Sequence, residues 1–184
     1  MRRGSVLAFA LLAVLGWTAS TLAAAAIDPA MQAKVNEQVK YVQSWANDPT
    51  IVNAVKAINA SMPAANKAMT QEKWTTLTPF DPFVLSFSSN PVGLLLKAKK
   101  NQVISEGFVS AADGSKVGFL QKTTSWIHKG KPKHDVPMTG KTWQGEVETD
   151  QSTGLQQIQI AVPVLDGGKP IGSLVVGLQV ARLK

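Results

Sequence analysis

The segment from residue 121 to residue 143 carries most of the side chains that could bind a ligand. Its sequence, QKTTSWIHKGKPKHDVPMTGKTW, holds five lysines, both histidines of the chain and two tryptophans. Ammonium and hydroxyl groups bind polar ligands, and an indole ring can lie flat over an organic molecule. We therefore take Lys122, Thr124, Trp126 and Trp143 as candidate ligand-binding residues. The alternative is a solvated loop whose tryptophans fold back onto the core.

Acidic and hydroxyl side chains form a second group at Glu148, Asp150 and Ser152. Alternate residues of a strand share one face, so Glu148 and Asp150 could form a carboxylate pair. Two nearby acids are not enough to indicate acid–base catalysis, because such pairs are more often a surface pattern. The alternative for Asp150 is a turn residue that binds its own backbone.

His128, His134 and Met138 have side chains that copper or haem iron accepts as ligands. Their spacing is irregular, however, and the lysines around them repel a cation. We therefore expect no metal and no other cofactor, and we expect the two histidines to face solvent.

Motifs of the common enzyme classes are absent from the sequence. It contains no Gly-x-Ser-x-Gly, no phosphate-binding loop, no dinucleotide fingerprint and no His-Glu-x-x-His. It also contains no cysteine, which excludes disulfides, thiol chemistry and covalently attached c-type haem. We predict that the protein is not an enzyme.

The first 26 residues have the pattern of a secretory signal peptide. Arg2 and Arg3 precede an apolar stretch over residues 6–17, and a cluster of alanines follows it. This stretch is shorter than the about 20 residues of a membrane-spanning helix; an uncleaved anchor is the alternative. We predict a signal peptide over residues 1–26, one domain over residues 27–184, and a location in the periplasm or outside the cell.

The net charge of the 184-residue chain is +7. We expect no nucleic-acid partner, because such partners are rare outside the cytoplasm. The charge either keeps the protein soluble or attracts an anionic ligand or surface.

Helical patterns come first in the chain and strand patterns follow. Apolar spacing and Asp-Pro or Asn-Pro caps predict helices over residues 29–45, 51–58 and 92–100, with a short helix capped by Thr70. Residues 79–83 are expected to be irregular. Five strands are predicted, with Asp-Gly turns joining the first two and the last two: residues 103–111, 116–120, 143–149, 156–165 and 170–180. This order is typical of an α+β domain.

Four segments in this order resemble the Cache family of extracytoplasmic, PAS-like sensor domains. They are ANDPTIVNAVKAIN (residues 46–59), SEGFVSAADGSKVGF (105–119), EVETDQST (146–153) and IQIAVPVLDGGKPIGSLVVGL (158–178). The resemblance implies a five-stranded antiparallel sheet in the order 2-1-5-4-3, with a long N-terminal helix packed across one face. It also implies a ligand pocket on the other face, under the segment between strands two and three. Inner side chains of the first hairpin, Phe108 among them, would form its floor.

The chain differs from the family's usual pattern in two respects. It ends shortly after the last strand, which predicts a free-standing module that signals through a membrane receptor or kinase. Its arginines are Arg2, Arg3 and Arg182, so a bidentate guanidinium clamp for a carboxylate is not expected in the pocket.

These observations predict an exported, non-enzymatic module that binds a small organic molecule or anion. The ligand would lie beneath Trp126, with Lys122 and Asp150 at its polar ends; the resemblance places an acid near a ligand amine. The alternative is a structural or interaction module with the same fold and no pocket. A lined cavity beneath residues 121–143 would favour binding, and a filled one would favour interaction.

Overall fold

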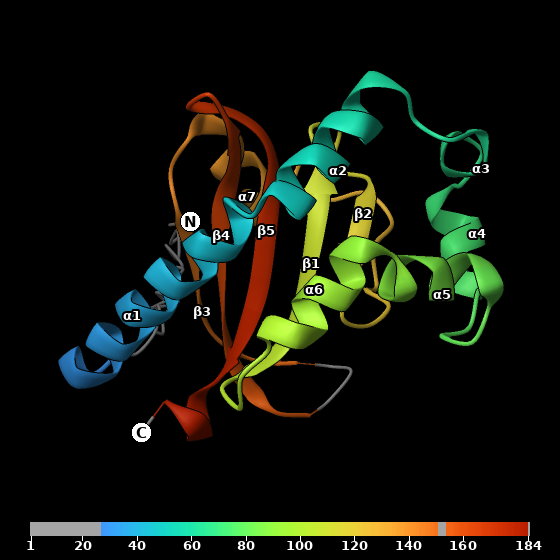
Figure 1. Cartoon of the computed structure of the whole chain (residues 1–184). Helices are drawn as coiled ribbons and strands as arrows, with labels where there is room; N and C mark the ends of the chain where they lie inside the picture. Colours follow the sequence, from blue (N-terminus) through green and yellow to red (C-terminus); the bar gives the residue numbers. More distant parts are fainter. Residues whose placement is uncertain (1–26, 151–153, 184) are drawn as a thin grey trace, which may run out of the picture.

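A computed structural model describes residues 27–150 and 154–183 of the chain (Figure 1). The predicted signal peptide and Ser152 lie outside the described residues. Within them, no helix combines the length and the apolar character that crossing a bilayer requires.

Three helices that begin at proline cover one face of the sheet: α1 (Pro29–Ala46), α2 (Pro49–Ala60) and α6 (Pro91–Lys99). Each follows an Asp or Asn cap, whose side chain accepts a hydrogen bond from a backbone N–H of the first turn. The Oδ1···N distances are 3.2 Å at Asp28, 3.0 Å at Asp48 and 2.8 Å at Asn90. Proline suits the first helical position, because its missing N–H would have no intrahelical partner.

The remaining helices between α2 and α6 lie beyond the β2 edge of the sheet (Figure 1). They are α3 (Ala64–Lys67), α4 (Gln71–Thr76) and α5 (Pro82–Ser89). Thr70 caps α4 as predicted, its hydroxyl accepting from the N–H of Lys73. The expectation of irregular structure over residues 79–83 was wrong from Pro82 onward, because Asp81 and Pro82 form the same start signal as in α1 and α2.

The sheet is antiparallel throughout and has the predicted order β2-β1-β5-β4-β3. Its strands are β1 (Ile104–Ala111), β2 (Lys116–Phe119), β3 (Trp143–Thr149), β4 (Gln156–Asp166) and β5 (Lys169–Gln179). The turn between β4 and β5 needs glycine, since Gly167 and Gly168 both have positive φ, at 56° and 84°. The predicted α+β class and topology are therefore confirmed.

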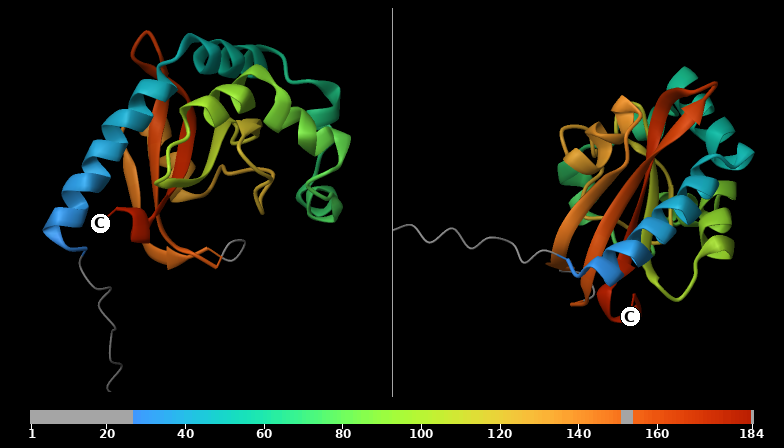
Figure 2. Two further views of the ribbon diagram at one scale, coloured as in Figure 1. Left: turned by 60° about the horizontal axis from the view of Figure 1, so that its bottom comes forward. Right: turned by 90° about the vertical axis from the view of Figure 1, so that its left-hand side faces the viewer.

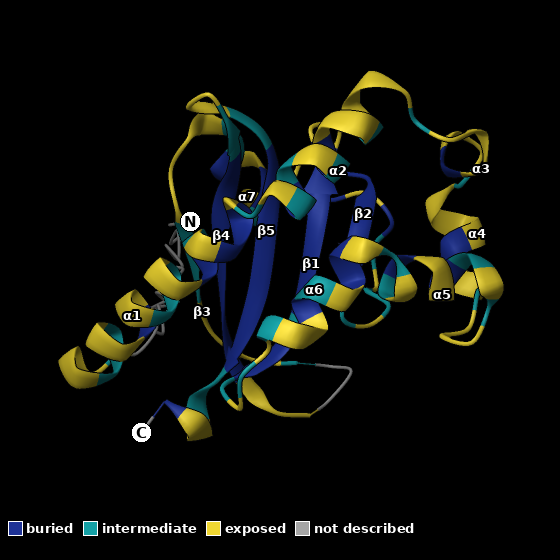
Figure 3. Ribbon diagram, in the orientation of Figure 1, coloured by how far each residue is buried: buried dark blue, intermediate teal, exposed yellow. Residues whose placement is uncertain are grey.

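Side chains alternate along the strands, so that the sheet has one apolar face and a second face, which we call the mixed face, with both polar and aromatic side chains. On the helix side, one continuous core packs β1, β4 and β5 against α1, α2 and α6, as the dark central strands of Figure 3 indicate. Strand β4 contributes Ile158, Ile160, Val162 and Val164, the side chains predicted to share a face. Side chains at the intervening positions point to the other face.

The other face is covered by the connection from β2 to β3, residues 120–142, which we call the β2–β3 segment. It contains α7 (Pro132–Asp135) and the 3-10 helix η1 (Pro137–Thr139). Helix α7 packs against β3, β4 and β5, on the side of the sheet opposite α1 (Figure 2). The sheet is thus enclosed from both sides, by helices on one face and by this segment on the other.

Candidate ligand-binding site

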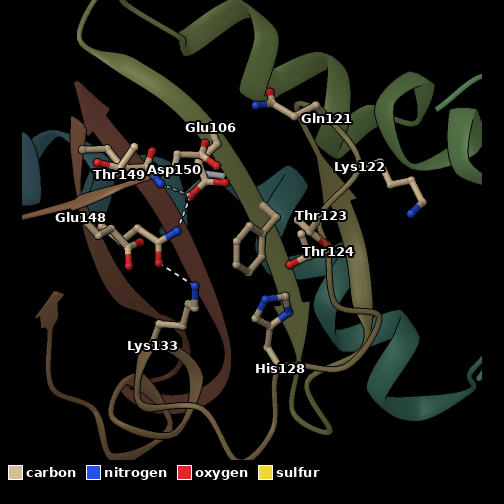
Figure 4. A pocket seen from close by; sticks show the side chains of 13 residues that line it. Glu106, Gln121, Lys122, Thr123, Thr124, His128, Lys133, Glu148, Thr149 and Asp150 are labelled. Carbon is tan, nitrogen blue, oxygen red and sulfur yellow. Dashed lines mark hydrogen bonds between the residues drawn. The ribbon is translucent and has the colours of Figure 1, made fainter. Parts of the chain in front are cut away.

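A cavity of about 230 Å³ lies between the mixed face of the sheet and the β2–β3 segment (Figure 4). It is lined by residues of β1, β3, β4 and that segment: Glu106, Phe108, Gln121, Lys122, Thr123, Thr124, His128, Lys133, Glu148, Thr149, Asp150, Gln157 and Gln159. Most of these side chains are polar, so the cavity is suited to a small polar molecule rather than a purely apolar one.

The sheet wall of the cavity is built by alternation along two strands. Glu106 and Phe108 of β1 point to this face, as do Gln157 and Gln159 of β4, whereas their neighbours enter the helix-side core. Gln157 and Gln159 are both buried. Buried amides have to be hydrogen-bonded, and these two amides bind the carboxylate of Glu106 and the ammonium of Lys133.

Glu106 is the centre of this hydrogen-bond network. Gln157 Nε2 donates to Glu106 Oε1 at 3.3 Å, and Gln159 Nε2 donates to the same oxygen. Gln159 Oε1 accepts from Lys133 Nζ at 2.6 Å. Burial raises the pKa of Glu106, against the opposing effects of the Gln159 hydrogen bond and the Lys133 charge. Burial lowers the pKa of Lys133, and the charges of Glu106 and Glu148 oppose that shift.

A second buried network lies at the other end of the cavity. His128 is 3% exposed and lines the cavity, and its Nδ1 is hydrogen-bonded to Nζ of Lys116, which is completely buried. The Phe108 ring lies against both groups, 4.4 Å from the imidazole and 4.7 Å from the ammonium nitrogen. Burial lowers the pKa of Lys116 well below its usual value. Burial, followed by the charge of Lys116, lowers the pKa of His128 to about 2.

The expectation that both histidines face solvent was wrong. His134 is also buried, with Nδ1 2.8 Å from Ser173 Oγ and Nε2 3.4 Å from the carbonyl oxygen of Ala112. Both imidazoles face the sheet, because the β2–β3 segment folds over its mixed face. The described residues contain no group of three or more His, Cys, Asp or Glu side chains that could hold a metal ion.

Five of the predicted ligand-binding residues line the cavity together: Phe108, Lys122, Thr124, Glu148 and Asp150. Lys122 lines the cavity, but its ammonium group points away. Its Nζ lies 4.7 Å from the centre of the Trp74 ring, and Figure 4 shows the side chain directed away from Glu106 and Asp150. The Lys122 ammonium therefore does not occupy the position expected for a ligand's polar end.

The two predicted tryptophans are not part of the cavity lining. Trp126 is 1% exposed and packs in an aromatic cluster with rings of α4, α5 and β2: Trp74, Phe83, Phe87 and Phe119. Its backbone N–H donates to Gln71 Oε1 at 2.8 Å. Trp143 lies opposite Ala161 and lines a separate surface hollow beside α1. Trp126 is buried among apolar rings, and Trp143 is partly buried against the same cluster, as large aromatic side chains favour.

The strand residues of the site were not singled out in the sequence. Glu106, Gln157 and Gln159 occupy positions between apolar residues that share the opposite face. A strand covered on only one side would present them to water. The available signal was the long β2–β3 segment, which has to cover that face and so turns these polar positions into the wall of a covered site.

A scan against protein-family models finds no match, and a search of the curated proteins finds none either. Among solved structures, the E. coli DcuS sensor domain is similar, with a TM-score of 0.51 at 12% identity, over 85% of this chain and 96% of that one. The strand order and the covered second face therefore define the fold of a Cache-type, PAS-like sensor domain. The resemblance predicted from the sequence is confirmed at the level of the fold.

Two chemoreceptor domains are similar at TM-scores below 0.5. The ligand-binding domain of Campylobacter jejuni Tlp3, solved with L-norvaline, has a TM-score of 0.44 at 16% identity, over 83% of this chain and 55% of that one. The ligand-binding domain of the Pseudomonas aeruginosa PAO1 amino acid chemoreceptor PctC, solved with GABA, has a TM-score of 0.47 at 12% identity, over 83% of this chain and 56% of that one. This chain thus spans about half the length of these two domains.

Proposed function

We propose that this protein is an exported, non-enzymatic sensor module that binds a small polar organic ligand in the cavity beneath the β2–β3 segment. The bound state would be passed to a membrane receptor or kinase. The observation that carries the proposal is the polar wall on the sheet. Glu106, Gln157 and Gln159 lie on a sheet face that the β2–β3 segment covers, where a strand packed on both faces usually has apolar side chains.

The arrangement of charge indicates how a ligand would be oriented. Glu148 and Asp150 lie on the same side of the cavity as Glu106 (Figure 4). A ligand amine would meet carboxylates there, while Phe108 offers an apolar surface and Thr123 and Thr124 offer hydroxyl groups. Charged groups that become buried need such partners, because an unpaired buried charge is costly.

The competing function, an interaction module without a pocket, calls for a filled mixed face. The cavity therefore favours ligand binding. The fold neighbour DcuS points in the same direction, since it is a sensor domain.

A thermal-shift screen with small acids, amines and purines tests this proposal. A ligand present at about 100-fold its dissociation constant stabilises the native state by about 2.7 kcal/mol. Asp150→Asn should then weaken binding by about 1–3 kcal/mol, because the ligand loses a charged partner in the cavity wall. Glu37→Gln, which removes a carboxylate from exposed α1 on the other face, serves as the matched control. Equal affinity of the two variants would argue against the cavity as the binding site.

A further inference from the structure

Lys116 occupies a position in which a lysine is unusual. It is 0% exposed, and its side-chain nitrogen has one hydrogen-bond partner among the described residues, His128 Nδ1. No described carboxylate lies within ion-pair distance of it. A lysine stem can usually carry its ammonium to solvent, but this one ends on the Phe108 ring behind the cavity wall.

The charged groups facing this pair are basic. Lys131 and Lys133 of the β2–β3 segment act on both Lys116 and His128, and His134 of α7 acts on His128. Asp113 and Asp135 act on His134 instead. Three further carboxylates act on Lys133 from the opposite side of the cavity: Glu106, Glu148 and Asp150. The cavity therefore has an acidic end on β1 and β3 and a basic end at His128.

We propose that His128, backed by Lys116, forms a subsite for one anionic group of the ligand, a carboxylate or a phosphate-type oxyanion, and that the pair takes up one proton when this group binds. The inference rests on the proposed function of the cavity. Because Nδ1 of His128 is occupied by Lys116, the Nε2 N–H is the donor left for the ligand. The added proton comes from solvent and converts the Lys116 amine to an ammonium, whose charge the bound anion compensates.

This assignment accounts for a residue that weakens the empty protein. A buried amine without a carboxylate costs stability, and an apolar side chain of similar size would pack without that cost. Once an anion lies on the other edge of His128, the same amine can be protonated as one member of a compensated pair. Since the charge is created on binding, the subsite would select anions over neutral groups of the same shape.

Calorimetry measures the predicted proton directly. Acetate, succinate and inorganic phosphate are titrated into the protein at constant ionic strength, in two buffers with different ionisation enthalpies. We expect uptake of about one proton per bound anion. Affinity should then fall about tenfold for each unit by which the pH rises, between the pKa of the free pair and that of the anion-bound pair. The imidazole signals of His128 should change in nitrogen-15 NMR spectra, in which the chain's other histidine, His134, is the internal reference.

Lys116→Met should abolish the proton uptake and weaken anion binding at least about tenfold, the effect of losing one charge-assisted partner. Lys34→Met makes the same substitution on exposed α1 and should leave both quantities unchanged. If Lys116→Met does not fold, the two-buffer measurement on the unmodified protein decides by itself.

Anion binding without proton uptake would overturn the inference, and so would failure of all three anions to bind. If amines or neutral compounds bind with their affinity dependent on Asp150 and with no proton taken up, the proposed function stands and this subsite does not. Failure of every compound in the thermal-shift screen would count against the proposed function itself.

Discussion

Ser110 and Ser173 lie opposite each other on β1 and β5, and both are completely buried. Ser173 Oγ is hydrogen-bonded to His134 Nδ1 at 2.8 Å, whereas Ser110 Oγ has no partner among the described residues. The two hydroxyls therefore form a matched pair that differs mainly in one hydrogen bond.

Ser173→Ala should lower the free energy of unfolding by about 1–3 kcal/mol, because it leaves a buried imidazole nitrogen unsatisfied. Ser110→Ala should be close to neutral or slightly stabilising, because it removes a hydroxyl that has lost water without gaining a partner. Urea unfolding of the two variants measures the difference. An equal loss in both would contradict the hydrogen-bond assignment of His134.

Trp126 is expected to act through stability rather than through ligand contact. Its ring lies 5.2 Å from Trp74 and 5.6 Å from Phe87 in the aromatic cluster. Trp126→Ala should cost about 3–5 kcal/mol of stability, as large-to-small core substitutions do, and Trp126→Phe should cost less.

The folded Trp126→Phe protein should keep the ligand affinity of the unmodified protein, as calorimetry can measure. Phe108→Leu is the comparison, because Phe108 is equally buried but lines the cavity. A larger loss of affinity in Trp126→Phe than in Phe108→Leu would place the ligand beneath Trp126 after all.

At the scale of elements, the β2–β3 segment is held on the sheet by two neutral imidazoles. Burial lowers the pKa of His134, so the native state keeps it neutral while the unfolded chain protonates it below about pH 6.5. The stability that it contributes is therefore complete above that pH. It is lost as the pH falls toward the folded-state pKa, by up to about 1.4 kcal/mol per pH unit. His128 contributes with the same sign, since its folded-state pKa is about 2.

Urea unfolding at about pH 7.5 and about pH 5.5, on either side of the unfolded histidine pKa, tests this dependence. The unmodified protein should lose more stability on acidification than His134→Gln, which no longer titrates at this position. Burial raises the pKa of Glu106, and its protonation favours the native state as the pH falls. Because Glu106 is present in both proteins, its contribution cancels when the unmodified protein is compared with His134→Gln. Equal losses would mean that His134 does not link the segment to pH.

At the scale of the whole molecule, the two faces of the sheet serve different purposes. The helix side holds the continuous apolar core, so most of the burial that stabilises the fold lies there. The mixed face combines the aromatic cluster at the β2 edge with the polar cavity toward β3 and β4. Substitutions in the cavity should therefore change binding more than folding, and substitutions in the helix-side core the reverse.

Export and trimming of the chain are predicted at this scale. Mass spectrometry of the protein from its native host should show a new N-terminus between about Ala24 and about Asp28, the window set by the small-residue rule. Cleavage after Ala26 would leave Asp28, the cap of α1, in place. Recovery of the full-length chain in a membrane fraction would support the anchor instead.

Local signals in the sequence predicted the five strands and the helices α1, α2, α4 and α6, though not α3, α5 and α7, and the resemblance supplied the topology. Asp28, Asp48 and Asn90 before proline indicate three helix starts, since a cap acts within its own first turn. Glycines after aspartate indicate the hairpins for an equally local reason. The strand Trp143–Thr149 has the bounds that its pattern predicted.

The sequence predicted five of the residues that line the cavity, and the tertiary structure alone decided the others and the partners of them all. Lys116 belongs to a short strand, and nothing in its neighbours shows that His128 will seal it from water. Trp126 joined an aromatic cluster and Lys122 turned toward Trp74 because α4 and α5, which come much earlier in the sequence, pack beside β2. Burial and partner depend on which distant segment lies opposite, and that is settled by packing of the whole chain rather than by spacing within any one segment.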